Sequence, residues 1–206
     1  MKIAVPALPC GNFLSVLKVI EKSGGSGELV QQPADLRRYD RIILPGVGAF
    51  DHGMESLNIN GWTDTLNELV LHRKVPVLGI CLGMQLMCID SEEGHIPGLG
   101  WIHGHVRRFC LPTDSSLKIP HMGWNTITVQ KQNPLIPFDE SEQRFYFVHS
   151  FHAVCNRPED VLATTSHGYE VTAAFCKDNI FGVQFHPEKS HRFGLALVKR
   201  FVEMPC

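Results

Sequence analysis

Cys81 stands where an apolar stretch ends, between two glycines in the run Gly79-Ile80-Cys81-Leu82-Gly83. This G-x-C-x-G spacing is that of a nucleophile elbow, a sharp strand-to-helix turn that exposes one reactive side chain. Glycines two residues before and after leave room for the turn, and a helix start favours the thiolate form of a cysteine. The pattern predicts a catalytic cysteine. The alternative is a buried cysteine beside an ordinary turn, because cysteine is often buried and glycine often marks turns.

A histidine and a glutamate follow much later, in His186-Pro187-Glu188 at the end of the strand-like stretch 180–185. A cysteine nucleophile needs a base, and the base needs a group that orients it. Proline at 187 biases His186 towards extended backbone, in which residues i and i+2 face the same way. The sequence therefore predicts a Cys81–His186–Glu188 triad. A surface turn is the alternative for the tripeptide.

A glycine-rich loop, Pro45-Gly46-Val47-Gly48, follows the strand-like segment 40–44. Its glycines can turn bare backbone N–H groups towards an anion, as an oxyanion hole requires. A dinucleotide-binding G-x-G-x-x-G loop is excluded, because Asp51 stands where the third glycine should be. An ordinary turn after a buried strand remains the alternative.

Length and composition indicate one globular domain spanning residues 1–206. The formal net charge of −2 gives no reason to expect nucleic acid or an anionic membrane as partner, and no apolar run is long enough to span a bilayer. Seven cysteines without a C-x-x-C motif suggest neither a disulfide framework nor a zinc knuckle, so we expect a cytoplasmic protein. Eleven histidines lack matching ligands at metal-site spacing, and we expect no metal ion.

Strand-like and helix-like segments alternate in the first half and predict a parallel sheet covered on both faces. These segments are strands at 2–6, 28–32, 40–44 and 76–80 and helices at 12–23, 62–73 and 83–89. The second half predicts antiparallel strands added to that sheet, at 101–109, 124–130, 144–149, 161–166, 171–176 and 180–185, before a helix at 192–203. We therefore expect an α/β fold, a three-layer αβα arrangement with a mostly parallel sheet. Cys81 and the 45–48 loop fall at carboxyl ends of strands, where such folds bind ligands.

Together, the 45–48 loop, the run Gly79–Gln85 and the run Gly182–Ser190 resemble the motifs of class I glutamine amidotransferases. More narrowly, Pro120-His121-Met122-Gly123-Trp124-Asn125 and Tyr146-Phe147-Val148-His149-Ser150 are similar to the glutaminase subunit of imidazole glycerol phosphate synthase. The resemblance covers nearly the whole chain, and the motifs occur in the family's order.

This resemblance implies that Cys81 attacks the side-chain amide of glutamine, that His186 moves the proton, and that Glu188 orients the imidazole. It implies no cofactor. The oxyanion hole would be formed by backbone N–H groups of Leu82 and the 46–48 loop. Residues implied in glutamine binding are Gly48, Gln85, Ser150 and Phe151.

The resemblance also implies a partner, a (β/α)8 cyclase that forms a heterodimer with this chain. Ammonia would pass to it without release and be used to make imidazole glycerol phosphate and an aminoimidazole carboxamide nucleotide (AICAR) in histidine biosynthesis. The positions implied to face the cyclase are Gly11, Asn12, His121, Met122, Gly123, Trp124, Asn125 and Lys189.

One stretch departs from the family. Pro6-Ala7-Leu8-Pro9-Cys10 stands where many members have Asp-Tyr-Gly-x, before the matching Gly11 and Asn12. One alternative is therefore a paralogous amidotransferase that supplies ammonia for amidino sugars of surface polysaccharide such as lipopolysaccharide. Two others are a stand-alone cysteine hydrolase, which would cleave peptides or esters without a partner, and an inert binding module, whose Cys81 would resist a glutamine-mimicking electrophile.

Overall fold

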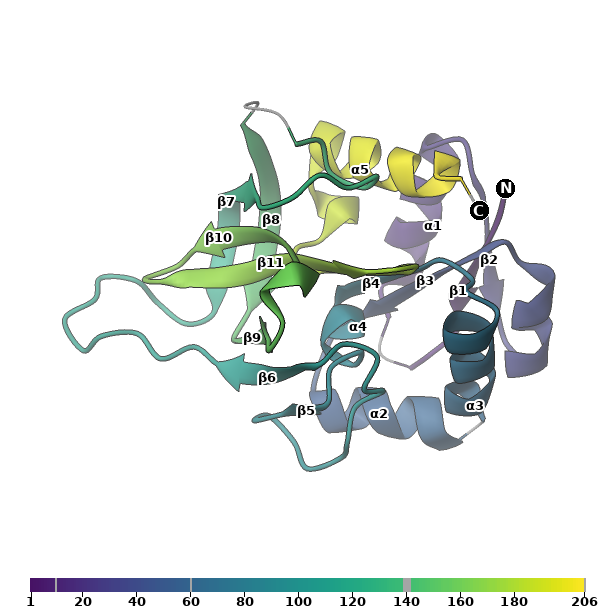
Figure 1. Ribbon diagram of the computed structural model, residues 1–206, viewed down its shortest axis with the longest axis horizontal. Coiled ribbons are helices and arrows are strands. Elements are labelled where there is room, and N and C mark those ends of the chain that lie inside the picture. The colour runs from purple at the N-terminus through teal and green to yellow at the C-terminus, as the bar shows by residue number, and fades with distance from the viewer. Residues whose placement is uncertain (10, 60, 139–141, 206) are drawn as a thin grey trace.

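The computed structural model describes residues 1–9, 11–59, 61–138 and 142–205. Helices cover both faces of a large sheet, with α1 and α5 on one side and α2, α3 and α4 on the other (Figure 1). This is the expected three-layer αβα arrangement. Each helix buries an apolar side against the sheet, which leaves the strands enclosed between two layers.

The described residues form a nine-stranded sheet in the order β2-β1-β3-β4-β12-β11-β10-β7-β8. Neighbours from β2 to β12 run parallel, and neighbours from β12 to β8 run antiparallel. A parallel core with antiparallel strands added on one side is thus confirmed. The strands are β1 (Lys2–Pro6), β2 (Ser26–Val30), β3 (Arg41–Gly46), β4 (Val77–Cys81), β7 (His121–Val129), β8 (Gln143–His149), β10 (Val161–Ser166), β11 (Glu170–Lys177) and β12 (Ile180–Val183).

The helices lie in two groups. On one face, α1 and α5 contact each other, and on the other, α2 contacts both α3 and α4. Short 3-10 segments complete the chain at three connections. The bounds are α1 (Phe13–Lys22), α2 (Phe50–Ile59), α3 (Trp62–Asn67) with its π-helical continuation η2 (Glu68–His72), α4 (Leu82–Gln85), α5 (His191–Glu203), η1 (Pro33–Arg38), η3 (Pro158–Asp160) and η4 (Pro187–Lys189).

Two apolar clusters fill the space between the layers, and the strands contribute to them alternately. In β3, Ile43 belongs to the cluster that includes Phe201 of α5. Its neighbours Ile42 and Leu44 belong to the cluster that includes Met54 of α2. Because successive strand residues point to opposite faces, a strand covered on both sides must be apolar throughout. This is why residues 42–44 are apolar without a break.

A second, three-stranded sheet in the described residues consists of β5 (Asp90–Ser91), β6 (Gly104–Arg108) and β9 (Phe151–Cys155). The expectation that the segment 101–109 joins the large sheet was wrong, because β6 pairs antiparallel with β9 instead. The sequence had not indicated β9. The chain leaves β8 at Ser150, whose carbonyl accepts the Phe109 N–H, and the next residues then run along β6.

The helix expected at 83–89 ends early, since α4 stops at Gln85. Beyond it, the N–H of Ile89 donates to the Gly104 carbonyl, so the backbone bonds to the neighbouring loop instead of continuing the helix. The predicted helix 62–73 is present as α3 and η2. Helix α2 was not predicted, although Phe50, Met54 and Leu57 recur at helical spacing and are buried.

The elbow at Cys81 depends on a close approach of two backbones. Cys81 has φ 53° and ψ −109°, a conformation that L residues rarely adopt. A Cβ atom added at Gly83 would lie 1.8 Å from the Leu44 carbonyl oxygen, and one at Gly79 would lie 2.7 Å from the Gly83 carbonyl oxygen. Both positions therefore require glycine, because the atoms in the way belong to the backbone. This packing holds α4 against the ends of β3 and β4.

We expect Gly83→Ala to lower the free energy of unfolding by more than about 3 kcal/mol, because backbone cannot yield to an added methyl as a side chain can. Gly27→Ala is the matched control, since the atoms within reach of a Cβ there are ends of the Ile20 and Leu17 side chains. It should cost less than about 1 kcal/mol. Urea unfolding followed by circular dichroism measures both. Equal losses would show that the elbow has more freedom than its contacts indicate.

Candidate active site

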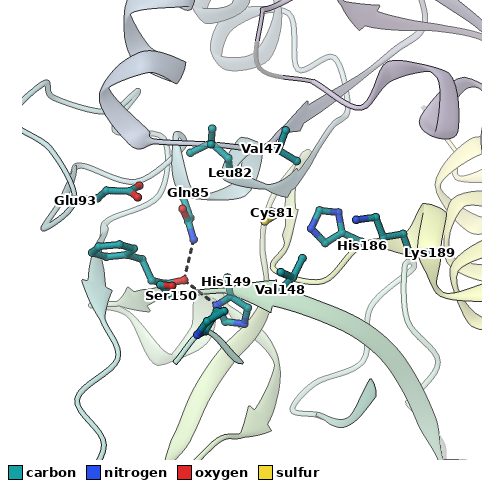
Figure 2. Close-up of a pocket in the computed structure, with 13 residues that line it drawn as sticks. Val47, Cys81, Leu82, Gln85, Glu93, Val148, His149, Ser150, His186 and Lys189 are labelled. Atoms are coloured by element: carbon teal, nitrogen blue, oxygen red, sulfur yellow. Dashed lines mark hydrogen bonds between the residues drawn. The ribbon is translucent and has the colours of Figure 1, made fainter. Parts of the chain in front are cut away.

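A cavity of about 420 Å³ opens at the carboxyl ends of β3 and β4. Loops at this edge of a parallel sheet are where α/β folds bind ligands. The wall includes both Cys81 and His186, which come from distant parts of the chain (Figure 2). The other lining residues are Val47, Gly48, Leu82, Gln85, Glu93, Pro120, Val148, His149, Ser150, Phe151 and Lys189.

His186 and Glu188 form a buried pair. The ring Nδ1 of His186 lies 2.8 Å from Oε1 of Glu188, and the two side chains are 2% and 1% exposed. His186 is extended, as Pro187 predicts, but Glu188 reaches it from the 3-10 turn η4 and not from an extended segment. The carboxylate thus fixes the proton on Nδ1 and leaves Nε2 for other work. Nε2 is buried and makes no well-aligned hydrogen bond to any described residue.

The charge state of His186 is set by competing effects. Burial alone would lower the pKa of the imidazole, because it disfavours the charged form. Interaction with the Cys81 sulfur and the hydrogen bond donated to Glu188, with the negative charges of both, outweigh burial and raise the pKa of His186 to about 9. At neutral pH the imidazole therefore carries a proton beside the sulfur. Since α4 spans only four residues, its dipole is small, and the positive charges that line the cavity with Cys81 are this imidazolium and Lys189.

Three of the four residues expected to form an oxyanion hole line the cavity. Val47 and Leu82 lie together along one side of the cavity (Figure 2), and Gly48, which follows Val47, also lines it. Gly48 has φ 106°, which turns the loop sharply after β3. Gly46 lies behind the wall, as the last residue of β3, where it pairs in register with Cys81. Within the 46–48 loop, Val47 and Gly48 are therefore the residues that can present N–H groups to the cavity.

Gln85 links the Phe151 backbone in the cavity wall to the side chain of Gln184. Its Nε2 donates to the Phe151 carbonyl at 2.9 Å and to Oε1 of Gln184 at 3.0 Å. Gln184 in turn points its own Nε2 at the Cys81 sulfur, 3.7 Å away. Because both N–H bonds of Gln85 are used, only the oxygen of its side chain can be offered to a ligand in the cavity.

A family model described as glutamine amidotransferase class-I matches residues 18–204 of the chain. The chain belongs to this family. It is 49% identical to the imidazole glycerol phosphate synthase subunit HisH of Bdellovibrio bacteriovorus, over 85% of this chain and 87% of that one. It is 45% identical to the imidazole glycerol phosphate synthase subunit HisH 2 of Pseudomonas aeruginosa, over 94% and 95%. The structure of PurLQS from Thermotoga maritima shares the fold, with a TM-score of 0.73 at 20% identity and coverage of 97% and 95%.

Ser150 and Phe151 lie in the cavity wall of this glutamine amidotransferase as expected. The Phe151 carbonyl also accepts a hydrogen bond from Nδ1 of His149, at 2.8 Å. The dashed lines in Figure 2 mark this bond and the bond from Gln85. The carbonyl therefore has both lone pairs occupied, and it serves the scaffold of the site.

His149 is hydrogen-bonded to a second buried histidine, His121. Nδ1 of His121 lies 3.0 Å from Nε2 of His149, and Nδ2 of Asn125 lies 3.1 Å from Nε2 of His121. Burial lowers the pKa of His149 to about 3 and that of His121 to about 4, and neighbouring histidines add to both shifts. Both rings are therefore neutral at pH 7. The side chain of His121 is 4% exposed, so the expectation that it faces a partner protein was wrong for this side chain.

The other positions expected at a partner interface are more open. Met122 and Trp124 alternate with His121 along β7 and are 61% and 41% exposed. Trp124 stacks on His191, with ring centroids 5.4 Å apart, and Lys189 lies over the Tyr146 ring. The partly exposed remainder of the set is Gly11, Asn12, Gly123 and Asn125. Cys10, the last residue of the atypical segment, lies outside the described residues.

Sequence reasoning missed two residues of the site. Glu93 lines the cavity and accepts the Phe50 N–H at the start of α2 with Oε2, at 2.9 Å. Gln184 lies next to the Cys81 sulfur and is fully buried. The only signal for Gln184 was a polar residue at the end of the apolar strand 180–185, two residues before His186. Glu93 lies in an irregular loop whose path no sequence period reveals.

Three findings bound the chemistry of the described part of the chain. No helix there is long and apolar enough to cross a membrane. No three or more His, Cys, Asp or Glu side chains there are arranged to hold a metal ion. Its cysteines, at positions 81, 88, 110, 155 and 176, are free thiols.

We expect the buried histidine pair to make the protein sensitive to acid. A histidine whose pKa is lowered on folding contributes stability above its ordinary pKa of about 6.5, and this stability is lost as the pH falls towards the folded value. Replacing His149 with glutamine removes one such group and keeps a donor and an acceptor. Between about pH 6 and pH 4.5, the slope of unfolding free energy against pH should decrease by up to about 1.4 kcal/mol per pH unit. Urea unfolding at several pH values measures the slope, and identical slopes would contradict the buried neutral state.

Proposed function

We propose that this chain is the glutaminase subunit of an imidazole glycerol phosphate synthase, with Cys81 as nucleophile, His186 as acid and base, and Glu188 as the group that orients the imidazole. The observation that carries the proposal is that Cys81 and His186 line one cavity of a class I glutamine amidotransferase, with Glu188 paired to His186. The names of the relatives at 45% and 49% identity support the synthase assignment.

The first step uses the charge state of the site. In the reactive form of the site, His186 holds the proton of the Cys81 thiol, and the sulfur adds as thiolate to the side-chain amide carbon of glutamine. The negative charge that develops on the amide oxygen is met by N–H groups of Leu82 and of Val47 or Gly48. His186 then gives its proton to the leaving nitrogen, ammonia departs, and a glutamyl thioester remains on Cys81.

The second step reverses the roles. His186, now neutral, takes a proton from water, which attacks the thioester and releases glutamate. Glu188 holds the ring through Nδ1 in both steps, so Nε2 always faces the reacting atoms. Because the pKa of His186 is raised, the proton returns to it at the end of the cycle.

The cavity offers complementary groups for the amino-acid end of glutamine. Glu93 supplies the negative charge that an α-ammonium requires, and the side-chain oxygen of Gln85 supplies an acceptor beside it. Backbone groups of Gly48 and Ser150 and the N–H of Phe151 remain as candidates for the α-carboxylate and the amide. This division places the substrate between α2 and β9, with its side chain directed at Cys81.

Ammonia formed at Cys81 would pass to a (β/α)8 cyclase bound as a heterodimer, in the cytoplasm. We place that partner on the surface formed by Met122, Trp124 and Lys189, because all three are exposed and Lys189 also lines the cavity. Gly11 and Asn12 would extend this surface. The product of the pair would be imidazole glycerol phosphate together with AICAR.

One observation favours a different molecule as the acceptor of the ammonia. The segment 6–10 departs from the family pattern immediately before Gly11 and Asn12 in the sequence, and some relatives carry numbered names, such as HisH 2. A paralogue that supplies ammonia for an amidino sugar of surface polysaccharide would retain the glutaminase site and change this loop. The two acceptors differ in the partner enzyme and not in the chemistry at Cys81.

Complementation of a histidine auxotroph that lacks the glutaminase subunit tests the proposal. The wild-type chain should restore growth without histidine, and Cys81→Ala should not, because glutamine hydrolysis requires the nucleophile. In purified complexes, Cys81→Ala should abolish glutamine-dependent synthesis but leave the cyclase active with added ammonium. If the wild-type chain hydrolyses glutamine with a sugar-modifying partner and fails to complement, the second acceptor is correct. If Cys81→Ala also abolishes the ammonium-dependent reaction, Cys81 supports the fold or the interface instead.

A further inference from the structure

We infer that Gln184 is a further catalytic residue, whose side-chain N–H donates a hydrogen bond to the Cys81 sulfur and stabilises its thiolate. The inference rests on the proposed role of Cys81 as nucleophile. It assigns to Gln85 a second task besides substrate binding, which is to fix the direction of the Gln184 amide.

The contact itself is direct. Nε2 of Gln184 lies 3.7 Å from the sulfur of Cys81, and the Gln184 side chain is fully buried. Gln184 immediately follows β12, the parallel neighbour of β4, so it reaches the sulfur from the adjacent strand. A thiol is a weak acceptor, whereas a thiolate is a charged acceptor for which an N–H donor is worth about twice as much.

The orientation of the Gln184 amide follows from one carbonyl group. The oxygen of Phe151 can only accept, so the atom of Gln85 that lies 2.9 Å from it must be the nitrogen. The same nitrogen lies 3.0 Å from the Gln184 side chain, which must present its oxygen there. The remaining end of the Gln184 amide is the nitrogen, and this is the end that faces the sulfur. The Phe151 carbonyl therefore determines the orientation of both side-chain amides.

His149 strengthens this arrangement from the opposite side. Its Nδ1–H donates to the same Phe151 carbonyl, and its Nε2 faces His121. A flip of the Gln85 amide would bring its oxygen against the Phe151 oxygen, with both atoms largely removed from water. Such a contact is unfavourable because two acceptors would be left unpaired in a buried site. The Phe151 carbonyl thus fixes the orientation of the Gln85 and Gln184 side-chain amides.

Two donors then flank the sulfur. The His186 imidazolium supplies a proton that leaves during the reaction, and the Gln184 amide supplies one that stays. Because the amide does not titrate, its contribution persists after His186 has given its proton to ammonia. The thiolate also leaves again when the thioester is hydrolysed, so the same N–H stabilises the leaving group of the second step.

The test measures the sulfur and not glutamine hydrolysis. Gln184→Met removes the donor at similar volume, and Gln143→Met is the matched control. Gln143 is another buried glutamine, which bonds to the Pro137 carbonyl at the far end of β8 from His149. Alkylation of Cys81 by iodoacetamide is followed by peptide mass spectrometry, which separates Cys81 from the exposed Cys110.

At pH 7, Gln184→Met should alkylate Cys81 about tenfold more slowly than wild type, because less of the sulfur is thiolate. At about pH 10, where free thiols are ionised, the two rates should agree within about twofold. Gln85→Met should show a smaller loss at pH 7, since the Gln184 amide is then present but not held. Gln143→Met should match wild type at both pH values.

A wild-type alkylation rate at pH 7 in a folded Gln184→Met protein overturns the inference, and an equal loss at both pH values shows a structural defect instead. If the variant does not fold, NMR of the wild-type side-chain amides decides. A proton on Nε2 of Gln184 should be protected from exchange and should shift in Cys81→Ser, and an unshifted resonance overturns the inference. If the wild-type chain fails to complement but Gln184→Met slows alkylation at pH 7 as expected, the proposed function is refuted and this inference stands.

Discussion

The close contact between the elbow and the end of β3 is the constraint on which the site depends. Cys81 adopts a positive φ that costs roughly 1–3 kcal/mol in a residue with a side chain. The cost is borne because Gly79 and Gly83 allow the backbone of α4 to touch β3 and β4, with no room for a methyl group. The same contact places the Cys81 sulfur at the carboxyl edge of the sheet, beside the strand that leads to His186.

A buried polar network surrounds that sulfur. Its orientation is set by a carbonyl and a carboxylate, which can only accept hydrogen bonds. The Phe151 carbonyl accepts from Gln85 and His149, and Glu188 fixes the proton of His186 on Nδ1. Buried polar groups stabilise a single arrangement when all are paired, and they are costly when one is not. The network therefore gives one preferred position to the Gln184 amide and to the imidazole. Precise placement of these groups is what the proposed thiolate chemistry requires.

Much of this could be predicted from the sequence, for reasons that are local. The elbow is encoded in the glycine spacing around Cys81. The pairing of Glu188 with His186 was predicted from their nearness in sequence, although a 3-10 turn and not an extended segment brings them together. The segments 40–44 and 76–80, which are apolar at 42–44 and throughout 76–80, predicted strands covered on both faces. The mixed sheet and its two helical layers followed from the order of such segments.

What could not be predicted depends on contacts between distant segments. The small sheet that contains β6 and β9 depends on a turn at Ser150. The hydrophobic pattern of the sequence does not predict the direction of that turn. His121 was placed on the partner surface because its neighbours match family motifs, but strand alternation turns it inward to His149. Gln184 carried only a weak signal and Glu93 none, since a single polar residue acquires a role only from what the fold brings beside it.

The central claim is that Cys81, and no other thiol of the chain, reacts covalently with the side-chain carbonyl carbon of glutamine. Incubation of the complex with a diazo-ketone analogue of glutamine, followed by peptide mapping, tests it most directly. The account predicts modification of Cys81 alone, with protection by glutamine. Modification of the exposed Cys110 with Cys81 left free, or labelling of Cys81 that glutamine does not slow, would contradict it.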